Sequence, residues 1–343
     1  KAVSSRSPEE VAAAGRPRRG LAAYLRFDEA GIVLAVVLFF LVGAFTSPYF
    51  ATFDNLAGIL QSMTFLGFLA VGVGLALIAG EIDISVGSIY GLSSIVTALL
   101  LHDGFGVPVA IAGGLATGIA CGLLNGVVAQ LIDVPAIVVT LATLGVYRAL
   151  ALVLAGGSPV TGMPDAPLFF DWFGQGSLGG VSFITMLFLI VAIVTEIVLR
   201  NTALGFRIFA VGSNDTAARL VGFRVERIRL ILLVNSGFLA ALSGVCSVAY
   251  LRTAGPTGGT GYELTVLAAT IIGGVQLTGG RGSVIGVLLG LVVIGIIQNL
   301  IVLWGISPSW TQGVSGIVLI AAVTVTWLTR REGGKRKLTV SRS

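Results

Sequence analysis

The chain has 343 residues, of which 55% are hydrophobic and only 11% are charged, with a formal net charge of +5. Its mean hydropathy is +1.00, whereas soluble domains carry about 25% charged residues, so an ordinary soluble globular protein is excluded. Glycine occurs 48 times, about twice its usual share of roughly 7%. Because small residues let membrane helices approach closely, the composition predicts an all-α polytopic membrane helix bundle.

In chain order, we expect residues 1–29 to form a basic cytoplasmic tail, since they lack an apolar stretch of signal-peptide length. Residues 30–328 then form the transmembrane domain, and residues 329–343 form a second basic cytoplasmic tail. A spanning helix takes about 20 apolar residues, and about ten segments approach that length. The shortest, Leu264–Leu277, is expected to be tilted, re-entrant or interrupted. The ten predicted spans are Ala30–Phe45, Leu56–Gly80, Ile84–Leu101, Val107–Leu131, Pro135–Ala155, Val181–Leu199, Leu230–Leu251, Leu264–Leu277, Val284–Leu303 and Pro308–Leu328.

The positions of lysine and arginine predict the orientation of these spans. Cytoplasmic segments of membrane proteins are enriched in both residues. With ten spans, 19 of the 21 basic residues fall on one side, in the two tails, in residues 200–229 and at Arg281. Only Arg148 and Arg252 fall elsewhere. We therefore expect both termini to be cytoplasmic.

Patterns that would indicate catalysis or ATP binding are missing from the sequence. The single histidine, His102, lies at a predicted helix end, and neither paired carboxylates nor metal-ligand spacings occur. A phosphate-binding loop ends in Gly-Lys-Ser/Thr, but lysine occurs only at positions 1, 335 and 337, and Gly333–Arg336 lacks the hydroxyl residue. We expect no enzymatic activity, no metal and no cofactor in this chain. If transport is driven by ATP, the ATPase must be another polypeptide.

The longest internal hydrophilic segment, residues 200–229, is a candidate docking site for such a partner. Asn214 or Asp215 can cap a short helix beginning near Thr216, and Gly222 can end it. The small residues of this helix indicate a close contact. The alternative is a solvated basic loop that only fixes the topology. The candidate coupling residues are Asn214, Asp215, Ala217, Ala218, Arg219 and Gly222.

Polar residues within the predicted spans are candidates for a solute path. Asn125, Gln298 and Asn299 are uncharged hydrogen-bonding residues, which a polyhydroxylated solute needs when it leaves water. Arg148 is the one deep charge and a further candidate. In the alternative interpretation, the three amides join helices through interhelical hydrogen bonds, and Arg148 binds backbone carbonyls.

Four ordered parts of the chain carry a resemblance to a known family. They are Gly80–Ser88, Val134–Leu141, Asn214–Gly222, and Gly259–Leu264 leading to Leu277–Ser283. Over residues 30 to 328, the chain resembles the permease subunits of ATP-binding-cassette (ABC) importers for monosaccharides, of the ribose and autoinducer-2 type. The resemblance implies a type II ABC importer fold and a translocation path for a monosaccharide or a related small polar solute.

The resemblance also implies the partners. They are cytoplasmic ATPase subunits that bind ATP and magnesium, a periplasmic or lipid-anchored solute-binding protein, a second permease copy or paralogue, and the bacterial inner membrane. No nucleic-acid partner is expected. Residues 216–222 resemble the coupling-helix motif, which usually begins Glu-Ala-Ala; here Thr216 replaces the acid, so no salt bridge from this position is implied.

Arg252 is the only cation outside the predicted cytoplasmic set apart from Arg148. We expect this isolated charge to meet an acidic contact on the binding protein, acting through encounter rate and register. The alternative is an exposed arginine at a helix end. For the whole chain, two other functions stay open: a branched-chain amino acid ABC permease, or a self-sufficient channel or secondary carrier.

Overall fold

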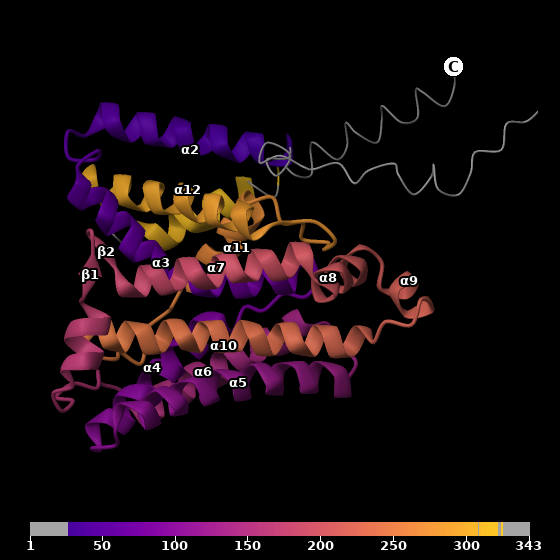
Figure 1. Ribbon diagram of the computed structural model, residues 1–343, viewed down its shortest axis with the longest axis horizontal. Helices are drawn as coiled ribbons and strands as arrows, with labels where there is room; N and C mark the ends of the chain where they lie inside the picture. Colours follow the sequence, from indigo (N-terminus) through magenta and orange to yellow (C-terminus); the bar gives the residue numbers. More distant parts are fainter. Residues whose placement is uncertain (1–26, 308, 322–323, 325–343) are drawn as a thin grey trace, which may run out of the picture.

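The computed structural model describes residues 27–307, 309–321 and 324, so the predicted tails lie outside the described residues except for residues 27–29. The described chain consists almost entirely of helices, which run side by side (Figure 1). The helices and strands are α2 (Phe27–Thr46), α3 (Phe53–Ile78), α4 (Val86–His102), α5 (Val107–Leu131), α6 (Ala136–Leu154), the π-helix η2 (Leu168–Gly174), β1 (Ser177–Leu178), β2 (Val181–Ser182), α7 (Phe183–Asn201), α8 (Ala203–Ser213), α9 (Asp215–Leu220), α10 (Val225–Leu251), α11 (Tyr262–Ile272) and α12 (Val284–Leu303).

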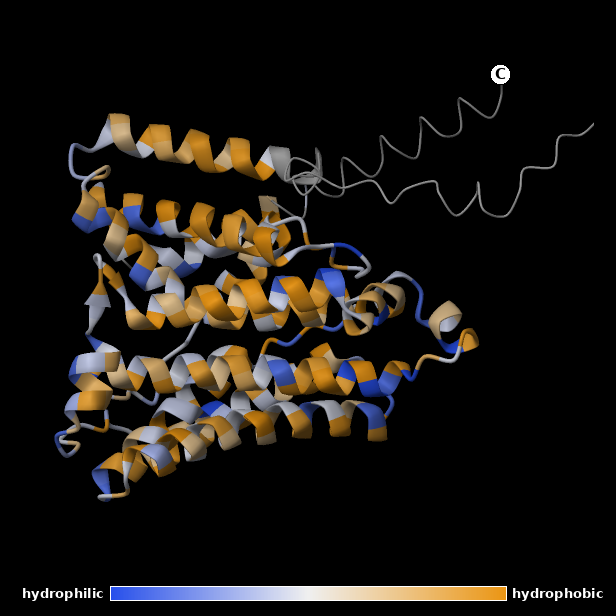
Figure 2. Ribbon diagram, in the orientation of Figure 1, coloured by the Kyte–Doolittle hydropathy of each residue, from blue (hydrophilic) through white to orange (hydrophobic). Residues whose placement is uncertain are grey.

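Six of the described helices are long and apolar enough to cross a membrane, namely α3, α5, α6, α7, α10 and α12. Shorter apolar helices lie at Gly31–Thr46 within α2, at α4, α8 and α11, and at Trp310–Ala321. Each predicted span overlaps one of these apolar helices. Among them, only α8 lies within the hydrophilic segment 200–229 and matches no predicted span. Apolar residues line the long helices (Figure 2). The prediction of an all-α polytopic membrane bundle is confirmed.

Two predicted boundaries are wrong. Helix α10 begins at Val225 rather than at Leu230, because the apolar side chains of Val225 and Ile228 are buried and continue its inward face. Arg229 therefore belongs to a helix and not to a loop. Helix α11 has only 11 residues and ends at Ile272, where Gly273 and Gly274 turn the chain, the second with a φ of +83°.

Helix α10 occupies the centre of the bundle and packs most extensively against α5, α3 and α4. Glycine allows the closest of these contacts. A Cβ atom on Gly118 of α5 would lie 2.3 Å from the carbonyl oxygen of Gly237 in α10, and the reverse substitution meets the same distance. No larger side chain fits without moving the backbone. The glycine content that predicted tight helix packing thus has a physical basis at this crossing.

The two ends of the bundle differ. Helices α8 and α9 and the start of α2 lie at one end, whereas η2 and the β1–β2 hairpin lie at the other (Figure 1). Arg281 also lies at the α9 end, because its neighbour Gly280 donates a hydrogen bond to the carbonyl of Ile78 at the end of α3. The described part of the chain thus collects its predicted cytoplasmic cations at one end of the molecule.

Candidate functional site

The short helix predicted between Asn214 and Gly222 is present as α9. The side chain of Asn214 caps it, accepting a hydrogen bond of 2.9 Å from the backbone N–H of Ala217. Gly222 follows the helix with a φ of +88°, and its N–H donates to the carbonyl of Arg219. Larger residues adopt this left-handed backbone only at a cost. Cap and stop signals therefore place a rigid, protruding helix at one end of the bundle (Figure 1).

The side chains that α9 presents outward differ from those predicted. Ala218 is only 3% exposed and packs inside its own chain, so its side chain does not lie on the outward surface of α9, whereas Ala217 is exposed. The outward apolar side chains are those of Leu220 and Val221, which are 85% and 70% exposed. We call these two residues the apolar tip. Apolar side chains grouped on a tip that predicted topology places outside the membrane are typical of a protein-docking surface.

Ion pairs surround the base of α9. Arg219 pairs with Glu226 in the first turn of α10, and this hydrogen bond raises the pKa of Arg219 above its ordinary value. Arg229 pairs both with Asp215, the first residue of α9, and with Glu81 in the segment between α3 and α4. These contacts fix the helix against the bundle without covering the apolar tip.

The segment Gly80–Ser85 connects α3 to α4 outside any helix or strand, and burial alternates along its residues from Glu81 to Ser85. Glu81, Asp83 and Ser85 are buried, and the isoleucines between them are partly exposed. Asp83 accepts hydrogen bonds from the N–H and hydroxyl of Ser85 at 2.9 and 2.7 Å, and from the hydroxyl of Ser236 in α10 at 2.8 Å. A charge-bearing group buried inside a bundle is costly unless it is satisfied in this way.

The predicted path residues do not form one cluster. Asn125 is fully buried; its amide donates to Ser85, and its carbonyl accepts from Thr143 and Tyr147 of α6. Asn299 in α12 forms a reciprocal pair with Asn55 of α3, at 2.8 and 3.1 Å. Both amides therefore make the interhelical hydrogen bonds of the alternative interpretation. Gln298 is half-buried on α12.

Arg148 lies deep in the bundle and binds a loop. Its Nη1 donates to the carbonyls of Gly258 and Pro256, at 2.5 and 3.2 Å. The loop leads into α11, where the carboxylate of Glu263 accepts a hydrogen bond from the N–H of Gly261. Gly91 of α4 lies against the carbonyl of Gly258, and its lack of a side chain leaves room for the guanidinium group of Arg148. Arg148 thus connects α6 to the entry of α11, as its alternative interpretation states.

Arg252 ends α10 at the opposite end of the bundle from α9. It forms an ion pair with Asp171 of η2 and lies over the ring of Phe170, 5.5 Å from its centroid. The premise that Arg252 is an isolated charge is therefore wrong, because η2 provides a carboxylate 81 positions away in the sequence. A docking role for this partly exposed residue stays a prediction.

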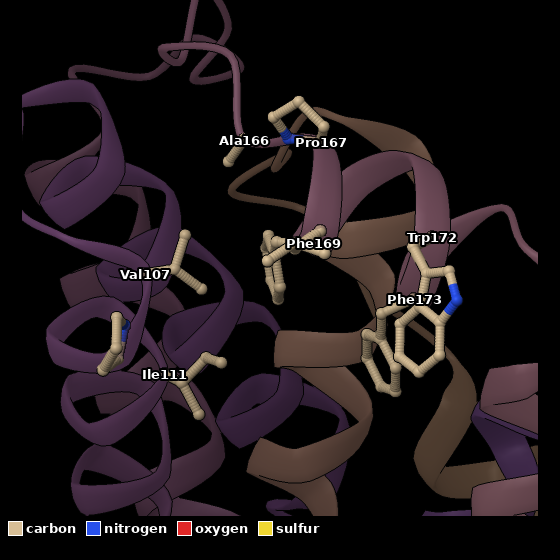
Figure 3. Close-up of a pocket in the computed structure, with 9 residues that line it drawn as sticks. Val107, Ile111, Ala166, Pro167, Phe169, Trp172 and Phe173 are labelled. Atoms are coloured by element: carbon tan, nitrogen blue, oxygen red, sulfur yellow. The ribbon is translucent and has the colours of Figure 1, made fainter.

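A cavity of about 560 Å³ lies beside η2. Val107 and Ile111 of α5 face Phe169, Trp172 and Phe173 of η2 across it (Figure 3). Its lining is apolar, so it lacks the convergent polar groups that a sugar site requires. The cavity is therefore not a candidate for recognition of a polar solute.

Sequence reasoning missed several residues of these two regions. The sequence predicts a short helix before Gly222 but does not say which of its side chains point outward. Leu220 and Val221 are large apolar residues that lie between charged residues, and this pattern is the signal for an exposed apolar surface. Arg229 was assigned to a loop. The sequence places Glu81 and Asp83 in a loop between predicted spans and within the segment Gly80–Ser88, and the alternation of polar residues and isoleucines over Glu81–Ser85 is the signal for their shared burial.

Comparisons with known proteins agree with this architecture. The family described as "Branched-chain amino acid transport system / permease component" matches residues 55–323. The chain is 36% identical over 299 residues to the ribose import permease protein RbsC of Escherichia coli K12, covering 87% of this chain and 93% of the relative. It is 35% identical to the autoinducer 2 import system permease protein LsrC of Escherichia coli O9:H4, covering 86% and 85%.

A third relative is the L-arabinose ABC transporter permease protein AraH of Azospirillum brasilense, 34% identical with 93% of each chain covered. A solved structure of an ABC transporter described as metal-chelate type, in an inward-facing conformation, is similar with a TM-score of 0.49 and 17% identity over 87% of this chain and 98% of that chain. The family match and the three permease relatives together show that the chain belongs to the permease-component family of ABC importers.

Proposed function

We propose that this chain is the path-forming subunit of an importer for a monosaccharide or a related small polar solute. The observation that carries the proposal is its likeness, over most of its length, to permeases named for ribose, autoinducer 2 and L-arabinose. The bacterial inner membrane is the proposed location.

A separate ATPase pair drives transport and binds ATP with magnesium. We assign its docking to α9, whose apolar tip is exposed and whose base is held by ion pairs. Hydrolysis moves α9 of each of two permease copies or paralogues, and the bundles rock around a central path. In this alternating-access cycle the chain forms the translocation path and carries the coupling helix, and ATP is hydrolysed by the ATPase subunits.

The solute arrives on a binding protein at the end of the bundle that holds η2, the hairpin and Arg252. The side chains of Arg252 and Asp171 are 43% and 54% exposed there. Arg252 can therefore bind an acidic group of the partner, and Asp171 can bind a basic one. Arg148 and Gln298 are the remaining candidates for contact with the solute, since both side chains are only partly buried.

The test is uptake by vesicles that contain either this chain alone or the complex with its ATPase subunits and binding protein. We expect ATP-dependent uptake of labelled pentoses or related sugars by the complex only. Uptake of leucine or valine instead would assign the chain to the amino acid branch. Uptake by the chain alone, without ATP, would show a self-sufficient channel or carrier and overturn the proposal.

A further inference from the structure

Arg229, which no motif singled out, joins α9 to the interior of the bundle. Its Nε lies 2.7 Å from Oε1 of Glu81, and its Nη2 lies 3.5 Å from Oδ2 of Asp215. Asp215 begins α9, Arg229 belongs to α10, and Glu81 lies in the connecting segment between α3 and α4. One guanidinium group therefore connects the protruding helix, the central helix and a buried segment.

The two contacts of Arg229 differ in strength. Glu81 is 8% exposed, whereas the side chain of Asp215 is 45% exposed and its oxygen lies farther away. Charges that are closer and less solvated interact more strongly. The contact with Glu81 is thus the persistent one, and the contact with Asp215 is the one that lengthens or shortens when α9 moves.

A second set of polar contacts is joined to Glu81 through the backbone of the same segment. Two residues on, Asp83 binds Ser85 and Ser236, and the hydroxyl of Ser85 accepts a hydrogen bond from Asn125. Asn125 in turn accepts from Thr143 and Tyr147. These contacts tie the start of α4, α5, α6 and α10 together. Hydrogen-bond networks with discrete arrangements can carry energetic coupling between sites.

We propose that Arg229 is a positioning residue that transmits the movement of α9 to the connecting segment Gly80–Ser85, and through it to α4, α5 and α6. The proposal rests on the proposed function, since it needs an ATPase that moves α9. It goes further by assigning the route inside this chain along which that movement reaches the solute path. The route consists of ion pairs near α9 and of hydrogen bonds beyond Glu81.

Two variants test this role, and Arg229→Lys separates it from a direct contact with the ATPase, because Arg229 belongs to α10 and not to α9. Arg229→Lys keeps a positive charge beside Glu81, but an ammonium group is a single point charge and lacks the fork that reaches two carboxylates. Asp215→Asn removes the other partner and leaves the pair of Arg229 and Glu81 in place, so the bundle keeps its fold. The matched control is Asp133→Asn, an exposed residue in the turn after α5 whose φ of +51° also suits asparagine.

Each variant is measured in vesicles, in complex with ATPase subunits and binding protein. The readouts are ATPase capture and solute uptake per ATP hydrolysed. We expect wild-type capture for Arg229→Lys, and a loss of about five-fold or more in uptake per ATP for Arg229→Lys and Asp215→Asn, within the usual range of coupling effects. The double variant is no worse than either single variant, because both remove one link. Asp133→Asn behaves as wild type.

Wild-type uptake per ATP in Arg229→Lys and Asp215→Asn would overturn the proposal, as would losses that add in the double variant. Failure of the proposed function looks different, because the unmodified chain would then capture no ATPase or drive no ATP-dependent uptake. That outcome overturns the proposed function and this route together. The wild-type measurement distinguishes the two failures.

Discussion

Buried amides decide how the helices of this permease are joined. Asn125 has hydrogen bonds to Ser85, Thr143 and Tyr147, so its side chain serves three elements at once. Asn125 therefore contributes to stability through its hydrogen bonds to the hydroxyl groups of these three residues. A polar side chain inside a span is therefore not by itself evidence of contact with the solute.

Replacing Asn125 by alanine tests this interpretation. The change removes the three hydrogen bonds that Asn125 makes with Ser85, Thr143 and Tyr147, each contributing about 0.5–1.5 kcal/mol, and we expect a lower temperature of thermal unfolding in detergent. Gln298→Ala is the control, because Gln298 is only half-buried, and we expect little change. If Asn125→Ala unfolds like the wild type but transports poorly, the residue contacts solute and the structural role is wrong.

Arg252 tests the docking proposal at the opposite end. The pair with Asp171 is exposed, so its removal costs at most about 1 kcal/mol of stability. We expect Arg252→Ala to slow association of the binding protein at low salt and to weaken the salt dependence, because rim charges act on the association rate. Stopped-flow or surface binding at two salt concentrations measures this. An association rate and a salt dependence equal to those of the wild type would remove Arg252 from the docking surface.

Helix contacts set by glycine hold the bundle together where α5 crosses α10. We expect Gly237→Ala to impair folding or insertion, since the added Cβ atom meets the Gly118 carbonyl at 2.3 Å, and overpacking of a fitted contact commonly costs about 1–3 kcal/mol. Gly145→Ala, in α6 with no atom within 4 Å of the added Cβ, is the matched control. The measurement is the yield of monodisperse protein and its unfolding temperature. Equal values for the two variants would contradict a tight crossing.

The sequence predicts the helices and the bounds of α9, but it does not predict which way individual side chains point. Long apolar runs, the cap at Asn214 and the stop at Gly222 are local signals, so they appear in the sequence. The burial of Ala218 depends on how a six-residue helix rests on the bundle. The pairing of Arg252 with Asp171 joins distant positions, and no local pattern encodes it. Ala218→Trp would therefore disturb this chain itself and would not isolate the ATPase interface.

The whole molecule has the proposed docking helix at one end, a candidate binding-protein surface at the other, and a hydrogen-bonded polar network between them. Helix α10 links these features, since it carries Arg229 near α9, Ser236 beside Asp83, and leads to Arg252 at its far end. This arrangement suits a subunit that passes movement between two partners. It depends on a separate ATPase being held by α9.

Capture of the ATPase subunits by purified permease carrying Leu220→Asp tests that dependence most directly. A charge on the apolar tip cannot be buried in a partner, and loss of a docking anchor commonly costs 2 kcal/mol or more, so we expect capture to weaken by about ten-fold or more. Leu178→Asp, at a leucine of β1 that is 68% exposed and lies at the opposite end, should capture as the wild type does. Wild-type capture by an intact Leu220→Asp protein would contradict the assignment of α9 as the ATPase docking helix.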